Sequence, residues 1–196
     1  PYVGERRTGT VGFPLPGVKI KITDSKTGKV LADGEIGEIE VRGPNVFKGY
    51  WQMPEKTAEE LRKDGFFISG DLGKIDSDGY IHIVGRNKDV IISGGYNIYP
   101  KEIELLLDDQ AGVLESAVIG VAHADLGEAV VGILVPENDT TPNLDEIKQN
   151  ISKSLAKYKQ PKKLIVIPEI PRNTMGKVQK NLLREKYKDV CLTIEC

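Results

Sequence analysis

Cysteine, tryptophan, methionine and histidine are scarce in this chain, whose 196 residues include two Cys, one Trp, two Met and two His. Both cysteines, Cys191 and Cys196, stand near the C-terminal end, with no further Cys or His at the spacing of metal ligands. This excludes a zinc module built from cysteine and histidine. We therefore expect free thiols, a reducing compartment (the cytoplasm) and no metal site among these residues.

Long apolar runs and a strong excess of charge are also missing. No run approaches the roughly 18 apolar residues of a membrane span, and no signal peptide is recognisable. The net charge of −2 gives no general attraction to nucleic acid or to a membrane surface. The composition is that of a globular protein. Because the chain starts at Pro1, without Met and in loop-like sequence, we expect a piece of a longer protein.

Charge is unevenly distributed along the chain. Residues 87–156 contain four Lys or Arg against twelve Asp or Glu, a net of −8, whereas residues 157–196 contain ten against four, a net of +6. A basic segment after an acidic one favours an anionic partner, most simply one that carries phosphate. A solvated basic helix explains the same pattern, and charge alone does not separate the two explanations.

The apolar pattern changes near residue 87. Before it, alternating apolar and polar residues separated by turn residues predict a β-rich unit, residues 1–86. After it, β-branched runs alternate with helical periodicity and predict a small α+β domain, residues 89–196. Strands are predicted over 18–23, 34–43, 66–71, twice within 73–86, at the start of 90–109, and over 113–122, 128–136 and 163–168. Helices are predicted over 54–65, from Pro100 to 109, and over 144–158 and 178–187. The predicted fold class is α+β.

Two segments at the end of the β-rich unit carry candidate binding residues. In FFISGDLG (66–73), Asp71 follows an apolar strand, where a carboxylate can accept hydrogen bonds from the two vicinal hydroxyls of a ribose. In GRNKD (85–89), Arg86 can present a fork of donors to hydroxyls or phosphates, and Lys88 stands between the units at a place suited to a hinge. A turn-forming aspartate and ordinary linker charges are the simpler explanations of each segment taken alone.

Two segments of the α+β domain carry further candidates. In ISGGYNIYP (92–100), Gly94–Gly95 allows a ligand to approach the backbone closely, or allows positive φ angles in a tight turn. In PRNTMGKVQK (171–180), Gly176 presents Lys177 in a short polar loop, where its ammonium can meet charge that develops in a transition state. A tight turn and a surface loop explain these residues more simply when each is taken alone.

The four segments, in this order, resemble the closing motifs of the adenylate-forming superfamily, which comprises acyl-CoA synthetases, peptide-synthetase adenylation domains and luciferases. GTVGFPLPG (9–17) and GEIGEIEVRGPNVFKGYW (34–51) resemble that family's preceding motifs, so the resemblance covers almost the whole chain. The segments GPNVFKGYW, DGFFISGDLGKID, GGYNIYPKEIE and PRNTMGKVQK are most similar to those of bacterial malonyl-CoA synthetases.

The resemblance implies a β-rich subdomain at the end of a large AMP-binding domain, a hinge at residues 87–88, and a mobile C-terminal lid domain over 89–196. It also implies a two-step reaction that uses ATP, Mg²⁺ and CoA. A carboxylate attacks the α-phosphate of ATP, and the thiol of CoA then displaces AMP from the acyl-adenylate. The phosphate-binding loop, the acid pocket and most Mg²⁺ ligands of that family should precede Pro1, so we expect these residues alone to be inactive.

Carried over by position, the resemblance implies a role for each candidate. Asp71 would hold the ribose hydroxyls, and Arg86 would bind the same AMP moiety. Lys88 falls at the hinge position, where many members have Asp and others have Lys. Gly94–Gly95 would border the pantetheine tunnel. Lys177 matches the lysine that bridges the carboxylate and the α-phosphate during adenylation, and a lysine acetyltransferase modifies this lysine in related enzymes.

Several alternatives stay open at this point. The expected substrates are malonate or a similar short carboxylate, ATP and CoA, without nucleic acid and without a membrane span. A fatty-acyl or aryl-acid CoA ligase is the main alternative, because the acid pocket lies outside this chain. A non-catalytic interaction module explains the basic segment but not the order of the motifs, and an adenylation domain that loads a carrier protein predicts a carrier domain after Cys196. The lysines that could contact CoA are Lys157, Lys159, Lys162 and Lys163.

Overall fold

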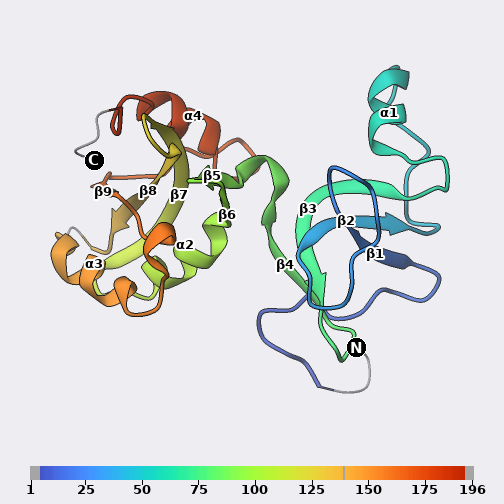
Figure 1. Ribbon diagram of the computed structural model, residues 1–196, viewed down its shortest axis with the longest axis horizontal. Helices are drawn as coiled ribbons and strands as arrows, with labels where there is room; N and C mark the ends of the chain where they lie inside the picture. Colours follow the sequence, from blue (N-terminus) through green and yellow to red (C-terminus); the bar gives the residue numbers. More distant parts are fainter. Residues whose placement is uncertain (1–4, 139, 193–196) are drawn as a thin grey trace. The chain divides into compact units, whose positions relative to one another are not determined.

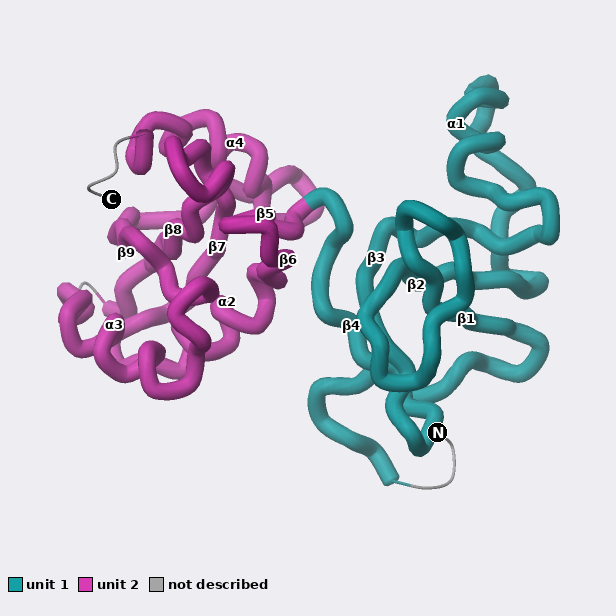
Figure 2. Tube along the Cα trace, viewed as in Figure 1, with its two compact units in different colours: residues 1–88 teal, residues 89–196 magenta. Residues whose placement is uncertain are grey.

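The computed structural model describes residues 5–138 and 140–192. The chain divides between Lys88 and Asp89 into two compact units, residues 1–88 and residues 89–196 (Figure 2). Within the described ranges, every helix is too short or too polar to cross a membrane. The mixed α+β composition predicted from the sequence is confirmed.

The first unit is an antiparallel sheet in which neighbouring strands follow one another along the chain (Figure 1). Ile22, Ile39 and Ile81, each from a different strand, form its small buried core. Because this core is small, we expect polar contacts to contribute much of the stability of this unit. Its strands are β1 (Lys19–Thr23), β2 (Gly37–Arg42), β3 (Phe67–Ile75) and β4 (Ile81–Arg86), and α1 (Pro54–Glu60) precedes β3.

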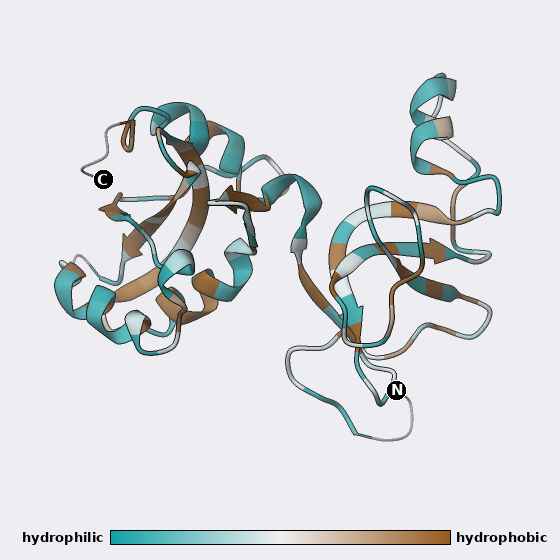
Figure 3. Cartoon of the chain, viewed as in Figure 1, coloured by the Kyte–Doolittle hydropathy of each residue, from teal (hydrophilic) through white to brown (hydrophobic). Residues whose placement is uncertain are grey.

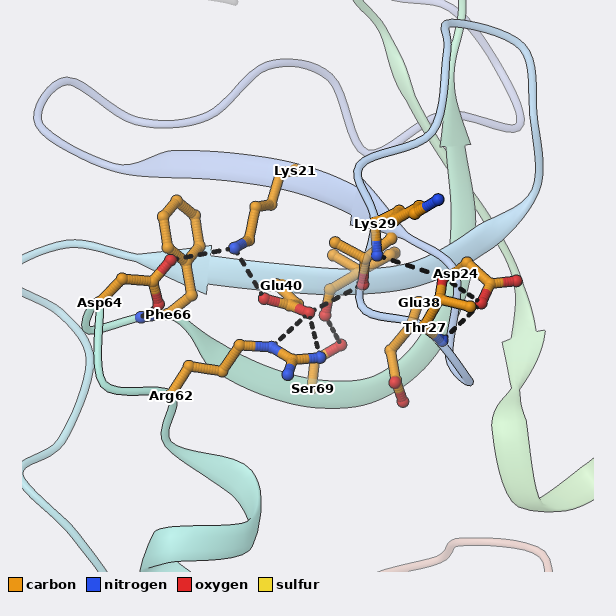
Figure 4. A network of polar contacts seen from close by, with 12 residues as sticks. Lys21, Asp24, Thr27, Lys29, Glu38, Glu40, Arg62, Asp64, Phe66 and Ser69 are labelled. Atoms are coloured by element: carbon orange, nitrogen blue, oxygen red, sulfur yellow. Dashed lines mark hydrogen bonds and ion pairs between the residues drawn. The ribbon is translucent and has the colours of Figure 1, made fainter.

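A buried carboxylate crosslinks three segments of the first unit (Figure 4). The side chain of Glu40 on β2 has 0% exposed surface, and its Oε1 accepts hydrogen bonds from Thr23 Oγ1 at 2.8 Å and Arg62 Nε at 2.7 Å. Lys21 Nζ lies 3.1 Å from Glu40 Oε2 and 3.2 Å from Asp64 Oδ2. A buried charge is costly unless it is paired, so these partners hold β1, β2 and the segment after α1 together.

The second unit is built on a sheet with the strand order β6-β5-β8-β7, and β9 pairs with β8 in parallel. β7 and β8 are antiparallel partners along their whole length, from Val113 opposite Pro136 to His123 opposite Gly127. The strands are β5 (Ile91–Ser93), β6 (Tyr96–Ile98), β7 (Val113–His123), β8 (Gly127–Pro136) and β9 (Lys163–Val166). The helices are α2 (Pro100–Asp108), α3 (Leu144–Ser152) and α4 (Lys180–Lys186), and 3₁₀ turns occur at Asn87–Asp89 and Lys157–Lys159.

The sheet of the second unit is buried on both faces. Val118 of β7 belongs to the same core cluster as Ile103 of α2 and Ile151 of α3. The next residue, Ile119, belongs to the cluster that contains Leu183 of α4. Because successive residues of a strand point to opposite faces, a strand covered on both sides must be apolar at almost every position. Figure 3 shows the corresponding hydrophobic colour along β7 and β8.

Most predicted strands are confirmed, but the strand predicted over 66–71 and the first one predicted within 73–86 form the single strand β3. The first predicted helix ends early. α1 stops at Glu60 instead of continuing to Gly65. Leu61 pairs with Phe67 in an isolated antiparallel bridge, and Arg62 is drawn to Glu40. Tertiary contacts therefore end the helix although the following residues are good helix formers. Local helix propensity alone does not predict this end point.

The helices predicted over 144–158 and 178–187 are also shorter than predicted. α3 ends at Ser152, because Leu155 turns into the core and only 4% of its surface is exposed. α4 begins at Lys180, because Val178 forms an antiparallel bridge with Arg172. The short strand β6, which completes a hairpin with β5, is absent from the sequence prediction.

The expectation of free thiols is wrong for Cys191. Its side chain is 0% exposed, lies in the cluster around Leu183, and is disulfide-bonded. Cys196 lies outside the described residues. Metal-ligand spacing does not report on disulfide formation, which depends on how close two cysteines lie in space. Cys191 therefore gives no support to the expected reducing compartment.

We expect Glu40→Gln to lower the free energy of unfolding by about 1–3 kcal/mol at pH 7, because Arg62 and Lys21 lose their buried counter-charge. Burial alone would raise the pKa of Glu40, but hydrogen bonds from Arg62 and Thr23 outweigh it and hold that pKa below its ordinary value. A depressed pKa means that the carboxylate stabilises the fold above its unfolded pKa, and that this contribution is lost as the pH falls through the folded pKa.

Urea unfolding of both proteins at pH 7 and at about pH 3 measures this effect. The difference between wild type and Glu40→Gln should be large at pH 7 and should shrink in acid. Glu59→Gln, which makes the same charge change at an exposed residue of α1, should stay within about 0.5 kcal/mol of wild type. A difference that grows in acid would contradict the assignment.

Candidate functional site

Asp71 and Arg86 lie directly opposite each other in the first unit. They are cross-strand partners of β3 and β4 and form an ion pair, with Arg86 Nε 2.8 Å from Asp71 Oδ1. Arg86 also reaches the carbonyl oxygen of Ser69. Both side chains keep contact with solvent, with 28% of Asp71 and 50% of Arg86 exposed. Strand pairing therefore brings together two candidates that stand in separate sequence motifs.

An open pocket of about 730 Å³ lies beside Arg86. Its volume is within the range of small-molecule sites. Its walls combine cations and carboxylates with aromatic and backbone surface, a mixture that suits a polar ligand carrying both hydroxyls and charge. The lining residues are Glu38, Tyr50, Lys56, Glu60, Phe67, Ile68, Ser69, Gly70, Arg86, Asn87 and Lys88.

Glu38 is a buried acid in this pocket that the sequence does not single out. Only 7% of Glu38 is exposed, and its Oε1 lies 3.4 Å from the side-chain nitrogen of Asn87. Burial raises the pKa of Glu38. Asn87 is the residue before Lys88, so β2 contacts the segment where the first unit ends. Lys88 itself is exposed.

Gly94–Gly95 forms the tight turn of the β5–β6 hairpin. The two glycines have φ angles of 56° and 84°, and the flanking residues Ser93 and Tyr96 are strand partners. Two positive φ angles in a two-residue hairpin loop define a type I′ turn, which L-residues with a Cβ adopt poorly. The turn accounts for both glycines, and both remain exposed at the surface.

A stacked aromatic pair stands next to this turn. The rings of Tyr96 and Tyr158 are 4.7 Å apart and nearly parallel, and 58% and 43% of these residues are exposed. The sequence offers no signal for this contact, because the two tyrosines come from distant segments. Lys159, one of the lysines considered for CoA, forms an ion pair with Glu102 at 2.7 Å.

Lys177 is held by its backbone in a narrow hairpin loop. Its amide donates to Asn173 Oδ1 at 2.9 Å, and its carbonyl oxygen accepts from the amide of Asn173 at 2.9 Å. Gly176 adopts a φ of 77°, which lets the chain reverse just before the lysine. The Lys177 side chain is exposed and forms no ion pair with any described residue.

Lys180, three residues further on, forms a largely buried ion pair instead. Its Nζ lies 2.5 Å from Glu104 Oε1, and 16% and 10% of the two side chains are exposed. Glu104 also accepts the amide of Val118 on β7 at 3.0 Å. Two lysines of one motif therefore differ: Lys180 fastens α4 to α2, while Lys177 is available to a ligand.

Histidine and acidic clusters give no sign of a metal site. Within residues 5–138 and 140–192, no three His, Cys, Asp or Glu side chains gather closely enough to bind a metal ion. His82 contacts Asp76 at 2.9 Å, and His123 accepts the amide of Asp125 at 3.1 Å. Both histidines therefore have structural partners.

Two protein families match separate parts of the chain. The AMP-binding enzyme family matches residues 2–51, and the AMP-binding enzyme C-terminal domain family matches residues 102–177. The crystal structure of ATP-bound MatB from Rhodopseudomonas palustris is 58% identical, with a TM-score of 0.92, over 97% of this chain and 38% of that one. The chain belongs to the adenylate-forming family of AMP-binding enzymes.

Curated relatives in this family are named for different acids. The malonate–CoA ligase of Arabidopsis thaliana is 40% identical over 96% of this chain and 32% of its own length. The feruloyl-CoA synthase of an Amycolatopsis species is 42% identical over 95% of this chain and 37% of its own length. The chain therefore spans about a third of the length of these adenylate-forming relatives.

We expect Gly95→Ala to destabilise the second unit by about 1–2 kcal/mol, because alanine adopts the left-handed conformation poorly. A Cβ at Gly95 would meet nothing within 4 Å, so the cost is one of backbone conformation alone. Gly95→Asn should cost less, since asparagine adopts positive φ more readily. Gly85→Ala is a matched control, because its Cβ also enters open space but its φ is not positive. Equal unfolding midpoints in urea for the Ala and Asn variants at position 95 would contradict the turn assignment.

Proposed function

We propose that this chain is the distal part of an acyl-CoA synthetase that activates a carboxylate with ATP and transfers it to CoA. In the first step a carboxylate oxygen bonds to the α-phosphorus of ATP, and pyrophosphate leaves. In the second step the CoA sulfur bonds to the acyl carbon, AMP leaves, and the thiol proton is lost. The observation that carries the proposal is the similarity to ATP-bound MatB along nearly the whole chain.

Asp71 and Arg86 are proposed to bind the AMP moiety. Arg86 occupies Asp71 Oδ1, which orients the carboxylate and leaves Oδ2 to accept hydrogen bonds from ribose hydroxyls. Arg86 also lines the pocket, together with Gly70, where φ is 72°. An arginine fork suits hydroxyl or phosphate oxygens, because its donors are fixed in one plane.

Lys177 is proposed to act in the first step. A carboxylate and the polyphosphate of ATP repel each other, so their approach requires a cation close to both. The Lys177 ammonium is exposed and pairs with none of the residues that the structure describes, so it can neutralise the charge that gathers as the new bond forms. In the second step this charge is no longer needed, and the lysine can leave the reaction centre.

Lys88 and Gly94–Gly95 are proposed to serve the change between the two steps. Lys88 is exposed in the 3₁₀ turn Asn87–Asp89, at the residue where the first compact unit ends, and hinges are often residues at the end of an element. The glycine turn presents backbone without side chains beside the Tyr96–Tyr158 stack. We propose that the pantetheine arm of CoA passes this turn in the thioester-forming step.

Mg²⁺ is proposed to bind ATP through groups outside the described residues, which contain no fitting cluster of carboxylates. The acid is proposed to be malonate or a similar short carboxylate. Support comes from the malonyl-CoA synthetase-like motifs and from the malonate–CoA ligase of Arabidopsis thaliana. An aryl or fatty acid is the alternative, because feruloyl-CoA synthase is equally similar to this chain.

The decisive experiment is Lys177→Ala in the full-length enzyme, with the two half-reactions assayed separately. We expect pyrophosphate release from ATP and malonate to fall about 10²–10³-fold, the usual cost of removing one positioned transition-state donor. Thioester formation from supplied malonyl-adenylate and CoA should be retained. Lys148→Ala is the matched control, because it removes an exposed lysine of the same unit. Equal loss of both half-reactions would exclude the proposed role.

Lys177 is also proposed as the target of a lysine acetyltransferase. The side chain is exposed, in a loop closed by the isolated bridge between Arg172 and Val178, so an enzyme can reach it. Acetylation would remove the positive charge and stop adenylation. We expect the intact mass of the enzyme to increase by one acetyl group. Treatment with a deacetylase should remove that group and restore activity. Acetyl groups found only at other lysines would contradict the proposal.

A further inference from the structure

Residues 171–188, which include Lys177, form three ion pairs with described residues elsewhere in the second unit. Arg172 pairs with Glu115 at the start of β7. Lys180 pairs with Glu104 of α2, and Arg184 pairs with Asp89 at 2.6 Å. The first of these pairs is different from the others, because Arg172 also reaches into the lysine loop itself.

The peptide group between Gly176 and Lys177 is held from both sides. Its carbonyl oxygen accepts a hydrogen bond from Arg172 Nη1 at 2.8 Å, and its N–H donates to Asn173 Oδ1 at 2.9 Å. The next peptide group is held as well, because the Lys177 carbonyl oxygen accepts from the Asn173 amide at 2.9 Å. Two planar peptide groups fixed in this way determine φ and ψ of Lys177, and hence the direction of its Cα–Cβ bond.

Arg172 is able to fix this peptide because it is fixed itself. One terminal nitrogen, Nη1, donates to the Gly176 carbonyl, and the other, Nη2, pairs with Glu115. A guanidinium is planar, so a carboxylate that orients one nitrogen orients the other. Lysine has a single terminal nitrogen on a flexible stem and cannot reproduce this fork.

We propose that Arg172 and Glu115 are positioning residues for Lys177, which aim its ammonium at the reacting carboxylate and α-phosphate. The proposal rests on the adenylation role proposed above for Lys177. Neither residue touches the substrates in this scheme. With 42% and 32% of their side chains exposed, they form a surface ion pair, which contributes little to stability. Their effect should therefore appear in the rate of adenylation more than in the unfolding transition.

The test uses Arg172→Lys and Glu115→Gln in the full-length enzyme. Arg172→Lys keeps the charge but loses the fork, and Glu115→Gln removes the group that orients it. Glu185→Gln is the matched control, because it removes a carboxylate from an exposed ion pair with Lys188, away from the lysine loop. Thermal unfolding of each variant is measured alongside activity.

We expect pyrophosphate release to fall about tenfold in Arg172→Lys and severalfold in Glu115→Gln, mainly in kcat, since a misplacement of ~1 Å can cost about 10²-fold. Thioester formation from supplied acyl-adenylate should stay within about twofold of wild type, because Lys177 is not needed there. A variant that slows both half-reactions equally, or neither, would overturn the proposal. Glu185→Gln should match wild type in both.

Two further measurements separate this proposal from the function on which it rests. Hydrogen exchange of the Lys177 amide should be faster in Arg172→Lys than in wild type, because the 176–177 peptide is then held only through its N–H, by Asn173 Oδ1, and no longer through its carbonyl oxygen. Unchanged exchange would overturn the positioning role. Lys177→Ala is assayed in parallel. If it leaves adenylation intact, the proposed function fails first; if it abolishes adenylation while Arg172→Lys does not slow it, only the positioning proposal fails.

Discussion

The antiparallel pairing of β7 with β8 is the contact on which the second unit depends. These two strands are its longest, and their alternate residues supply both core clusters. α2 and α3 cover one face, and the segment with α4 covers the other. If the register slipped by one residue, every side chain would exchange faces and both layers would lose their packing. The positions of the lysine loop and of the glycine turn follow from this ladder.

The role of a charged side chain in this structure depends on whether it is buried or exposed. Glu40 and Glu104 are almost inaccessible to solvent, and each satisfies several donors, so each connects segments that apolar contacts alone would hold weakly. Glu104 also occupies the amide of Val118 on the outer side of β7, where an unpaired strand edge would invite association. Lys177 is the opposite case. Its backbone N–H and carbonyl oxygen are both hydrogen-bonded while its ammonium is exposed to solvent, which suits the role that we propose for it.

Sequence patterns and structure agree where local chemistry is sufficient. The apolar runs of β7 and β8, the proline that opens α2 and the paired glycines all specify their own conformations. They disagree where distant residues compete for the chain. Leu61 and Val178 lie in segments with helical periodicity, but each forms an antiparallel bridge instead, Leu61 with Phe67 and Val178 with Arg172. The competing hydrogen bonds come from partners that no local window contains, so propensity could not have located these helix ends.

The sequence by itself determined the fold class, the order of the motifs and the candidate residues for which we propose a role at a nucleotide. It did so because residue type, spacing and turn chemistry are local properties that the chain keeps in any environment. Only the tertiary structure decided how those residues are presented. It paired Asp71 with Arg86 across two strands, buried Glu38, and joined Tyr96 to Tyr158. It also gave Lys177 and Lys180 different surroundings: Lys177 is exposed to solvent, whereas Lys180 forms an ion pair with Glu104, a residue of another helix.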